Sequence, residues 1–357
     1  MKIGILTYHR THNYGGCLQA LAMRLILENL GHTVYYIDYW PDYHKQAYSI
    51  FSLSLISSAP TFFSGVRSCF ESLRYLPYAI KRRKKFANFL NDCIIPFCRP
   101  LTEQYDIIVY GSDQIWRKQP SSNDYNPVYF GQNDFDAEKN VAFSASMGVL
   151  PKTDVDRIRV KELCSNFSKI AVREKDLCQL LHEMGYTNTI VTMDPTLLIP
   201  HRIWDTFLKT QSYEGPKYVL FYELNKGTFD TSKVYKYAKE RGLILKTISG
   251  RATKNDTITE ITTAGPYEFM YWIKNAEYVF SSSFHGLAFS IIYEKQVFVS
   301  FQTNAERAKS LLDAAGMSQR FIEPNADIPA IAPIDYEQVR KKLAKNKEIS
   351  LNYLATI

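Results

Sequence analysis

Apolar and polar positions alternate along the start of the chain in a way that predicts strand, helix and strand in turn. We expect a strand at 3–8, a loop at 9–16, a helix at 17–30 and a second strand at 33–38. The hydrophobic period changes from that of a strand to that of a helix, and Gly31 suits the residue that follows a helix. This opening predicts a parallel sheet.

The pattern changes between residues 43 and 97. Long aromatic and apolar segments alternate there with basic residues, including the run 81–85, and strand signals are few. We interpret this stretch as a helical insertion within the first domain.

Strands and helices alternate again from residue 105 onwards. Strands are expected at 105–110, 140–145, 169–172, 189–193, 218–224, 243–248, 278–282 and 296–301, and helices before Met184 and at 231–241, 266–275, 286–293, 305–315 and 335–354. The pattern predicts an α/β protein whose parallel sheets gather ligands at the carboxyl ends of their strands. Two Rossmann-like domains facing a cleft are expected, at 1–198 on the acceptor side and at 199–334 on the donor side. A final helix at 335–357 is expected to cross their junction.

Composition agrees with a two-domain globular protein. The chain has 357 residues, of which 46% are hydrophobic and 22% charged, and a single core rarely serves this length. The net charge of +7 is spread over the chain apart from the run 81–85, which favours anionic small substrates or a membrane surface over nucleic acid. The 14% aromatic share suits either rings stacked on sugars or ordinary core.

The six cysteines form no CxxC pair, so we expect free thiols in a reducing cytoplasm. The first residues run straight into a strand pattern, without the apolar length of a signal peptide. No stretch is long enough to cross a bilayer. We therefore expect a cytoplasmic protein that is at most peripheral to a membrane.

A glycine pair marks the loop between the first strand and its helix. Asn13, Tyr14, Gly15 and Gly16 would let backbone N–H groups approach an anion at a helix N-terminus. The segment lacks the spacing of the dinucleotide fingerprint. A plain tight turn remains the alternative.

Polar residues and an aromatic ring follow the strand at 105–110. Ser112, Asp113 and Gln114 would hydrogen-bond a sugar that stacks on Trp116. A helix capped by Ser112 or Asp113 would have a similar sequence.

A serine-rich segment between a strand and a helix carries a histidine. Its hydroxyls and amides would bind phosphate, while His285 exchanges a proton. The segment comprises Ser282, Ser283, Phe284, His285 and Gly286. We expect His285 to lie at an exposed loop end and not in a core. A histidine that only caps this turn is the alternative.

Two arginines are candidates for holding an anion. Arg173 follows a strand and would bind a carboxylate or phosphate, or else pair with Glu174 or Asp176. Arg307 lies near the start of a later helix. The segment that begins at Asp194 favours a structural turn over a catalytic acid.

Taken together and in order, six such segments resemble the polysaccharide pyruvyl transferase family. They are Gly4-Ile5-Leu6-Thr7, Asn13-Tyr14-Gly15-Gly16, Gly111-Ser112-Asp113-Gln114-Ile115-Trp116, Val172-Arg173-Glu174, Asp194-Pro195-Thr196-Leu197-Leu198 and Ser283-Phe284-His285-Gly286. The resemblance implies a fold similar to GT-B glycosyltransferases, phosphoenolpyruvate as donor and a sugar or lipid-linked oligosaccharide as acceptor. It also implies that His285 does acid–base chemistry and that Arg173 helps to hold the donor.

The chain departs from the family pattern at one place. Better-known members have an arginine two residues before the histidine, where this chain has Ser283. The cation for the donor must then come from elsewhere, and Arg173, Arg307 and Arg251 are the candidates.

These considerations predict an enzyme that forms a pyruvate ketal in polysaccharide assembly at the inner face of the cytoplasmic membrane. We expect catalysis by His285 and Asp113, with no metal and no cofactor. Donor contacts are expected from Arg173, Ser282, Ser283, Phe284, Gly286 and Arg307, and acceptor contacts from Asn13, Tyr14, Gly15, Gly16, Ser112, Gln114 and Trp116. The alternatives are a nucleotide-sugar glycosyltransferase of the same architecture and a non-catalytic glycan-binding member.

Overall fold

The computed structural model describes residues 1–357 apart from 48–61, 121, 209–211, 225–226 and 250–257. Its first half is built on a seven-stranded sheet in the order β3-β2-β1-β4-β5-β6-β7, with parallel pairing throughout. The strands are β1 (Lys2–Leu6), β2 (Thr33–Ile37), β3 (Cys98–Arg99), β4 (Tyr105–Tyr110), β5 (Ala137–Ala145), β6 (Lys169–Val172) and β7 (Ile190–Val191).

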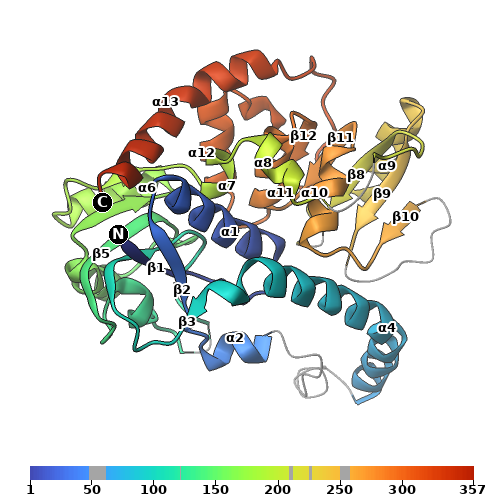
Figure 1. Ribbon diagram of the computed structural model, residues 1–357. Coiled ribbons are helices and arrows are strands. Elements are labelled where there is room, and N and C mark those ends of the chain that lie inside the picture. The colour runs from blue at the N-terminus through green and yellow to red at the C-terminus, as the bar shows by residue number, and fades with distance from the viewer. Residues whose placement is uncertain (48–61, 121, 209–211, 225–226, 250–257) are drawn as a thin grey trace.

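A second parallel sheet forms the other half, in the order β10-β9-β8-β11-β12 (Figure 1). Its strands are β8 (Tyr218–Tyr222), β9 (Ile244–Ile248), β10 (Ile258–Ile261), β11 (Tyr278–Ser281) and β12 (Gln296–Val299). All five residues of the central strand β8 are buried, as expected of a parallel strand covered on both faces.

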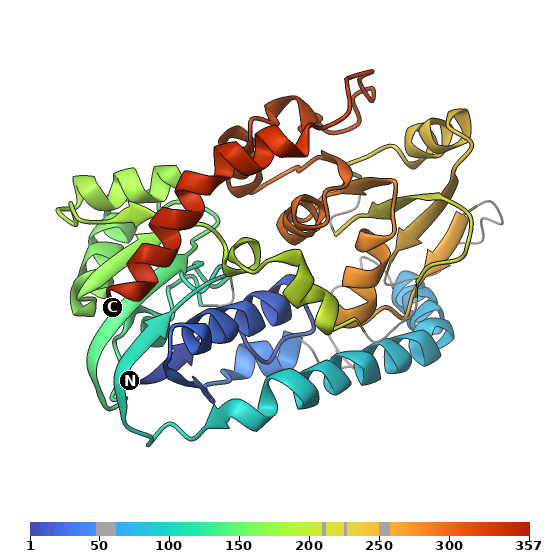
Figure 2. The same cartoon turned by 45° about the horizontal axis from the view of Figure 1, so that its top comes forward.

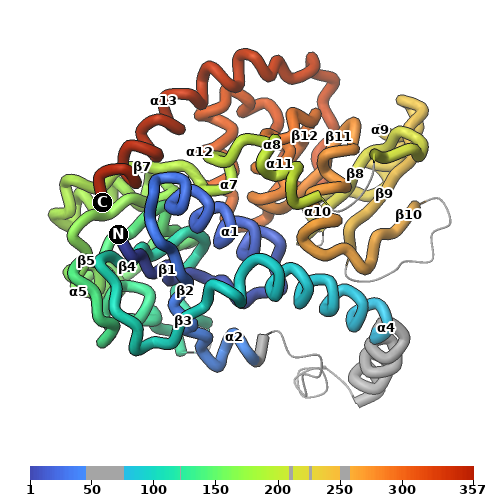
Figure 3. Tube along the Cα trace, in the orientation of Figure 1, coloured from blue at the N-terminus to red at the C-terminus, as the bar shows by residue number. Residues whose placement is uncertain are grey.

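Helices connect the strands and cover both sheets (Figures 1 and 3). They are α1 (Tyr14–Asn29), α2 (Asp42–Ala47), α4 (Phe62–Cys93), α5 (Asp154–Leu163), α6 (Lys175–Glu183), α7 (Pro195–Leu198), α8 (His201–Thr206), α9 (Thr231–Glu240), α10 (Pro266–Lys274), α11 (Phe284–Ile292), α12 (Glu306–Ala315) and α13 (Tyr336–Ala355). The predicted fold class, α/β with two Rossmann-like domains, is confirmed. The stretch predicted as a helical insertion contains α2 and α4, and its residues 48–61 lie outside the described residues.

Two helices tie the sheets together. Helix α13 runs from the second half to the first sheet (Figure 2), where the Tyr353 hydroxyl donates to the Ala142 carbonyl oxygen at 2.9 Å. Helix α4 packs on α10, with the rings of Phe89 and Tyr267 5.0 Å apart. These contacts hold the carboxyl ends of the two sheets close to each other.

A hydrophobic cluster shared by α1, α7, α10 and α11 fills the junction between the sheets. The Tyr14 ring of α1 stacks on Phe269 of α10, with ring centroids 4.5 Å apart. Within the described residues, none of the helices has both the length and the apolar character needed to cross a membrane.

Candidate active site

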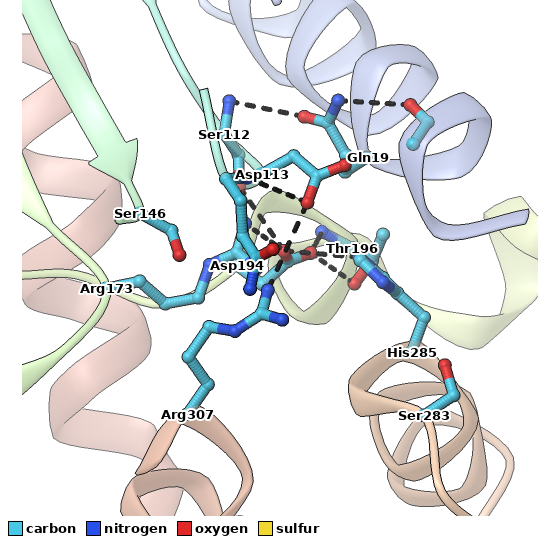
Figure 4. A network of polar contacts seen from close by, with 12 residues as sticks. Gln19, Ser112, Asp113, Ser146, Arg173, Asp194, Thr196, Ser283, His285 and Arg307 are labelled. Atoms are coloured by element: carbon cyan, nitrogen blue, oxygen red, sulfur yellow. Dashed lines mark hydrogen bonds and ion pairs between the residues drawn. The ribbon is translucent and has the colours of Figure 1, made fainter. Parts of the chain in front are cut away.

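Charged side chains from both halves of the molecule meet at the carboxyl ends of the strands (Figure 4). Arg173 follows β6, Asp194 precedes α7, and His285 lies in the first turn of α11. Asp113 follows β4, and Arg307 comes from α12. The first three are at most 7% exposed, so we call these five residues the Asp194 cluster and treat it as the candidate site.

Asp194 makes the most contacts in this cluster. Its Oδ1 accepts hydrogen bonds from the Thr196 backbone N–H at 2.9 Å and from the Thr196 hydroxyl at 2.5 Å. Its Oδ2 lies 2.7 Å from Arg173 Nη2, accepts from the Ser112 hydroxyl at 3.3 Å, and is 3.5 Å from His285 Nε2. The segment is therefore both the turn expected from the sequence and the centre of the site.

Asp194 is ionised in this position. Burial alone would raise its pKa, but the neighbouring Arg173 guanidinium, together with His285, holds the pKa of this carboxyl well below its ordinary value. A permanent negative charge thus lies between an arginine and the histidine predicted to be catalytic.

Both candidate arginines lie against the ring of Phe284. The guanidinium carbons of Arg173 and Arg307 are 5.0 and 5.4 Å from the ring centroid. Arg173 pairs with Asp194, not with Glu174 or Asp176 as the alternative expected. Its Nε and Nη1 atoms and Nε of Arg307 are buried and have no hydrogen-bond partner among the described residues.

A small cavity adjoins these arginines. It has a volume of about 160 Å³, and Arg173, Asp194, Phe284 and Arg307 are among its lining residues together with Thr192, whose buried hydroxyl also has no partner among the described residues. A wider cavity of about 480 Å³ lies between α6 and α12 and shares the lining residues Lys175 and Ser310 with the first.

Glu174 is a buried acid behind the arginines that the sequence suggested only as a partner for Arg173. It accepts hydrogen bonds from the Ser146 hydroxyl at 2.5 Å and from the Gly148 N–H at 3.3 Å. Burial raises its pKa, against the opposing effect of Arg307.

The glycine pair expected to receive an anion instead makes room for side chains. A Cβ on Gly15 would lie 1.9 Å from Nδ1 of His285, and one on Gly16 would lie 2.5 Å from Cγ2 of Thr11. The N-terminus of α1 is capped by Asn13, which accepts from the Gly16 N–H at 3.2 Å. The glycines thus allow α1 to pack against the ring of His285.

Two aromatic residues expected to contact the acceptor are buried. The Tyr14 hydroxyl donates to the Ala264 carbonyl oxygen at 2.9 Å. Trp116 is fully buried, and its Nε1–H donates to the Tyr129 carbonyl oxygen at 2.8 Å. The indole face is therefore core, and a sugar has no access to it in this conformation.

The other residues of the 111–116 segment lie nearer the cluster. Ser112 accepts a hydrogen bond from Arg173 and donates one to Asp194. Asp113 Oδ1 is 4.0 Å from Arg307 and accepts from the Gln114 N–H at 2.8 Å. The local sequence thus indicated the right segment, but its polar residues and its ring point to different surroundings.

The hydroxyl oxygens of the three serines before α11 accept hydrogen bonds from backbone N–H groups. Ser281 Oγ accepts from the Ser283 N–H at 3.1 Å, Ser282 Oγ from the Leu224 N–H at 2.8 Å, and Ser283 Oγ caps α11 through the Gly286 N–H at 3.5 Å. His285 was expected at an exposed loop end, and this is wrong: it is 7% exposed. Arg251, the third candidate cation, lies outside the described residues.

Sequence comparison accounts for this combination of motifs. The sequence profile of the polysaccharide pyruvyl transferase family matches residues 13–300. The chain belongs to the polysaccharide pyruvyl transferase family. No curated protein matches it significantly in sequence.

Several solved structures are similar to this transferase at low sequence identity. UDP-GlcNAc 2-epimerase from Neisseria meningitidis bound to UDP-GlcNAc is 11% identical, with a TM-score of 0.49 over 100% of this chain and 94% of that one. UDP-GlcNAc 2-epimerase from Methanocaldococcus jannaschii in complex with UDP-GlcNAc and UDP is 12% identical (TM-score 0.49, 99% and 93% covered). E. coli heptosyltransferase WaaC with ADP is 9% identical (TM-score 0.43, 97% and 100% covered).

Proposed function

We propose that this pyruvyl transferase uses phosphoenolpyruvate as its donor and forms a pyruvate ketal on sugar hydroxyls. The observation that supports the donor is a set of buried guanidinium N–H groups on Arg173 and Arg307, which line the small cavity. These groups have no hydrogen-bond partner among the described residues. Buried donors without partners are costly. A ligand with acceptor oxygens would satisfy them.

Phosphoenolpyruvate suits this cavity in its acceptor oxygens and in its size. It carries a carboxylate and a phosphate, and a guanidinium binds either group through paired N–H donors. The cavity of about 160 Å³ is smaller than the roughly 300–1,000 Å³ typical of drug-sized ligand sites. In this proposal Arg307 supplies the cation that the family pattern would place at Ser283, and the donor contacts both halves of the chain instead of the second alone.

The proposed reaction requires an acid near the methylene carbon of the donor. The His285 imidazolium gives its proton to that carbon, and a sugar hydroxyl attacks the carbon that bears phosphate. Phosphate leaves with the C–O bonding electrons, and a second hydroxyl closes the ketal. Asp194, 3.5 Å from Nε2, orients the ring. Asp113 accepts the proton of the first hydroxyl and passes it to the leaving phosphate, and the proton of the second hydroxyl returns to His285.

The acceptor would enter through the wider cavity. Its volume of about 480 Å³ is within the range that holds a ligand of sugar size. Carboxylates of Asp176, Glu306 and Asp313 and the ring of Phe321 line it, and these are groups that bind hydroxyls and the apolar face of a sugar. This route replaces the one through Trp116.

The donor proposal is tested by calorimetric titration of the full chain with phosphoenolpyruvate, inorganic phosphate and UDP-GlcNAc. Arg307→Met should weaken phosphoenolpyruvate binding at least about tenfold, because a charged hydrogen bond contributes roughly 1.5–3 kcal/mol. Arg340→Met is the matched control, since that arginine pairs with Glu294 on the surface with its side chain 59% exposed. The affinity of Arg340→Met for phosphoenolpyruvate should equal that of the wild type.

Other outcomes would identify a different activity. Binding of UDP-GlcNAc without phosphoenolpyruvate would favour a nucleotide-sugar glycosyltransferase and reject our donor. No affinity for any of the three ligands would favour a glycan-binding member without catalysis. Equal losses in Arg307→Met and Arg340→Met would place the donor elsewhere.

A lipid-linked acceptor and weak docking at the cytoplasmic membrane face remain part of the proposal. The basic run lies on α4, where Lys85 pairs with Glu268 at 2.7 Å and Arg82 lies 5.3 Å from the Tyr14 ring. This leaves Lys81 and Lys84 exposed, and each would contribute about 1 kcal/mol at an anionic surface. Docking predicts that the double Gln variant of these lysines sediments less with anionic vesicles than the wild type, and equal sedimentation would reject it.

A further inference from the structure

Three side chains with metal-ligating atoms converge at the edge of the first sheet, outside the Asp194 cluster. They are His9 after β1, Asp38 after β2 and Cys98 at the start of β3, and their ligand atoms all lie within 4.8 Å of one another. Because β1, β2 and β3 are neighbours in the sheet, residues far apart in the sequence meet there. The sequence alone predicted no metal site.

The hydrogen bonds of His9 indicate that a positive species belongs between its ring and Asp38. Nδ1 lies 3.1 Å from the Thr7 carbonyl oxygen, which can only accept, so Nδ1 carries a proton. Nε2 faces Asp38 Oδ1 at 3.4 Å. In a neutral imidazole with its proton on Nδ1, Nε2 is an acceptor, as is the Asp38 oxygen. The lone pairs of Nε2 and Oδ1 then face each other unless a second proton or a metal ion lies between them.

The spacing of these atoms suits a tetrahedral metal ion. Nitrogen and oxygen ligands each about 2.0–2.1 Å from zinc are about 3.3 Å apart at the tetrahedral angle, close to the 3.4 Å between His9 Nε2 and Asp38 Oδ1. A thiolate at about 2.3 Å from the ion would lie about 3.6 Å from either ligand. The sulfur now lies at most 4.8 Å from the other two ligand atoms, so it needs to move by at most about 1.4 Å.

The surroundings also resemble the outer shell of a metal site. A ligating histidine normally donates its other N–H to a carbonyl or carboxylate, and a ligating carboxylate is itself hydrogen-bonded. Here the Thr7 carbonyl holds His9, and Arg10 Nη2 donates to the outer oxygen Oδ2 of Asp38 at 2.6 Å. Arg10 thereby leaves Oδ1 directed at His9.

We infer that His9, Asp38 and Cys98 form a binding site for a thiophilic divalent cation of the zinc class. The carboxylate and the thiolate supply two negative charges to the ion, and soft sulfur with imidazole selects zinc over magnesium or calcium. The thiol proton is released on binding. The ion would fasten the ends of β1 and β2 to β3. It would thereby steady the loop that leads from Thr7, whose hydroxyl donates to the Ser112 carbonyl oxygen, towards α1.

The test uses the reduced, chelator-treated full chain and Co²⁺ as a spectroscopic probe, followed by competition with Zn²⁺. The wild type should bind one Co²⁺ with a thiolate-to-cobalt charge-transfer band that Zn²⁺ removes. Cys98→Ser should lose that band and bind Zn²⁺ at least about tenfold more weakly, because even outer-shell changes cost 10–100-fold. Cys164→Ser is the matched control: its thiol is buried, lies outside the cluster and should leave the band unchanged.

A variant at the histidine gives a second readout that does not depend on the thiol. His9→Gln should lower the Zn²⁺ affinity by a similar factor and abolish the rise in the thermal unfolding midpoint that Zn²⁺ gives the wild type. Absence of the charge-transfer band in the wild type would overturn the inference. Persistence of the charge-transfer band in Cys98→Ser would also overturn the inference, because the ion would then lie at another thiol.

Discussion

Replacing Asp194 with Asn removes one charge from the cluster with little change in shape. The Asn carbonyl oxygen keeps the hydrogen bonds from Thr196. Its amide group, however, puts a donor opposite Arg173 Nη2, where the carboxylate oxygen accepts at 2.7 Å. The Arg173 guanidinium then loses its counter-charge in a buried position, since the residue is only 5% exposed.

The cost of this change follows from burial. Removing one partner of a buried ion pair typically destabilises a protein by about 3–5 kcal/mol, a large part of the roughly 5–15 kcal/mol by which domains are stable. We expect a loss in this range in the free energy of unfolding. Asp205→Asn is the control, because Asp205 pairs with Lys274 at 2.9 Å with side chains 31% and 39% exposed and should lose less than about 1 kcal/mol.

Urea denaturation, followed by circular dichroism and by tryptophan fluorescence, measures both variants. A double-mutant cycle with Arg173→Met separates charge compensation from other effects. Each single change leaves one buried charge uncompensated, whereas the double variant removes both. The double variant should therefore lose at least about 2 kcal/mol less than the sum of the single losses. A loss no larger than that of Asp205→Asn, or additive losses, would refute the role of Asp194 as the counter-charge.

Three further predictions concern packing and pH. Gly15→Ala should lower the free energy of unfolding by about 1–3 kcal/mol, measured in urea, because its Cβ would lie 1.9 Å from His285 Nδ1; an unchanged midpoint would mean that this ring is not held in place. Burial lowers the pKa of His44 to about 4, whereas in the unfolded chain this histidine has its ordinary pKa of about 6.5. As the pH drops from about 6.5 to 4, the unfolded chain binds a proton at His44 before the folded chain does, so the free energy of unfolding should fall over this range. His44→Gln should flatten that fall. Burial raises the pKa of Glu174, so its contribution to stability is lost as the pH rises above the ordinary carboxyl value, and urea midpoints of Glu174→Gln should lack this loss.

Much of the architecture follows from local pattern. Strands β4 and β6 have the bounds that the hydrophobic runs predicted, because central parallel strands are buried on both faces and leave a clear apolar signature. The short edge strands β3 and β10 were not predicted. Strand β3 has two half-buried residues and β10 has one exposed residue among its four, and such strands are defined by the neighbour they pair with more than by their own sequence.

The site was predictable in part, for a related reason. Arg173, Ser112 and His285 each follow a strand, and the carboxyl ends of parallel strands meet at one edge whatever lies between them. The contacts of Asp194 were not predictable, since an Asp before a proline caps a short helix whether or not an arginine and a histidine from other segments approach its second oxygen. Trp116 was expected to contact the acceptor and is instead buried. An aromatic ring that follows a buried strand fits the rim of a cleft and the core of a domain equally well, so the sequence could not decide between them.

The charges of the Asp194 cluster explain why unpartnered N–H groups persist there. Arg173 and Arg307 face the carboxylates of Asp194 and Asp113, and burial raises the pKa of a third acid, Glu174, which disfavours its charged form. The formal charges thus balance, so no further anion is needed for neutrality. Each guanidinium nevertheless has five N–H donors, more than these oxygens can accept, and the N–H groups on the cavity side are left over. What the cluster lacks is acceptor oxygens and not negative charge. An anion that supplies them disturbs the balance unless a proton enters with it. The imidazole of His285, whose Nε2 lies 3.5 Å from Asp194 Oδ2, is a group in the cluster that can accept that proton.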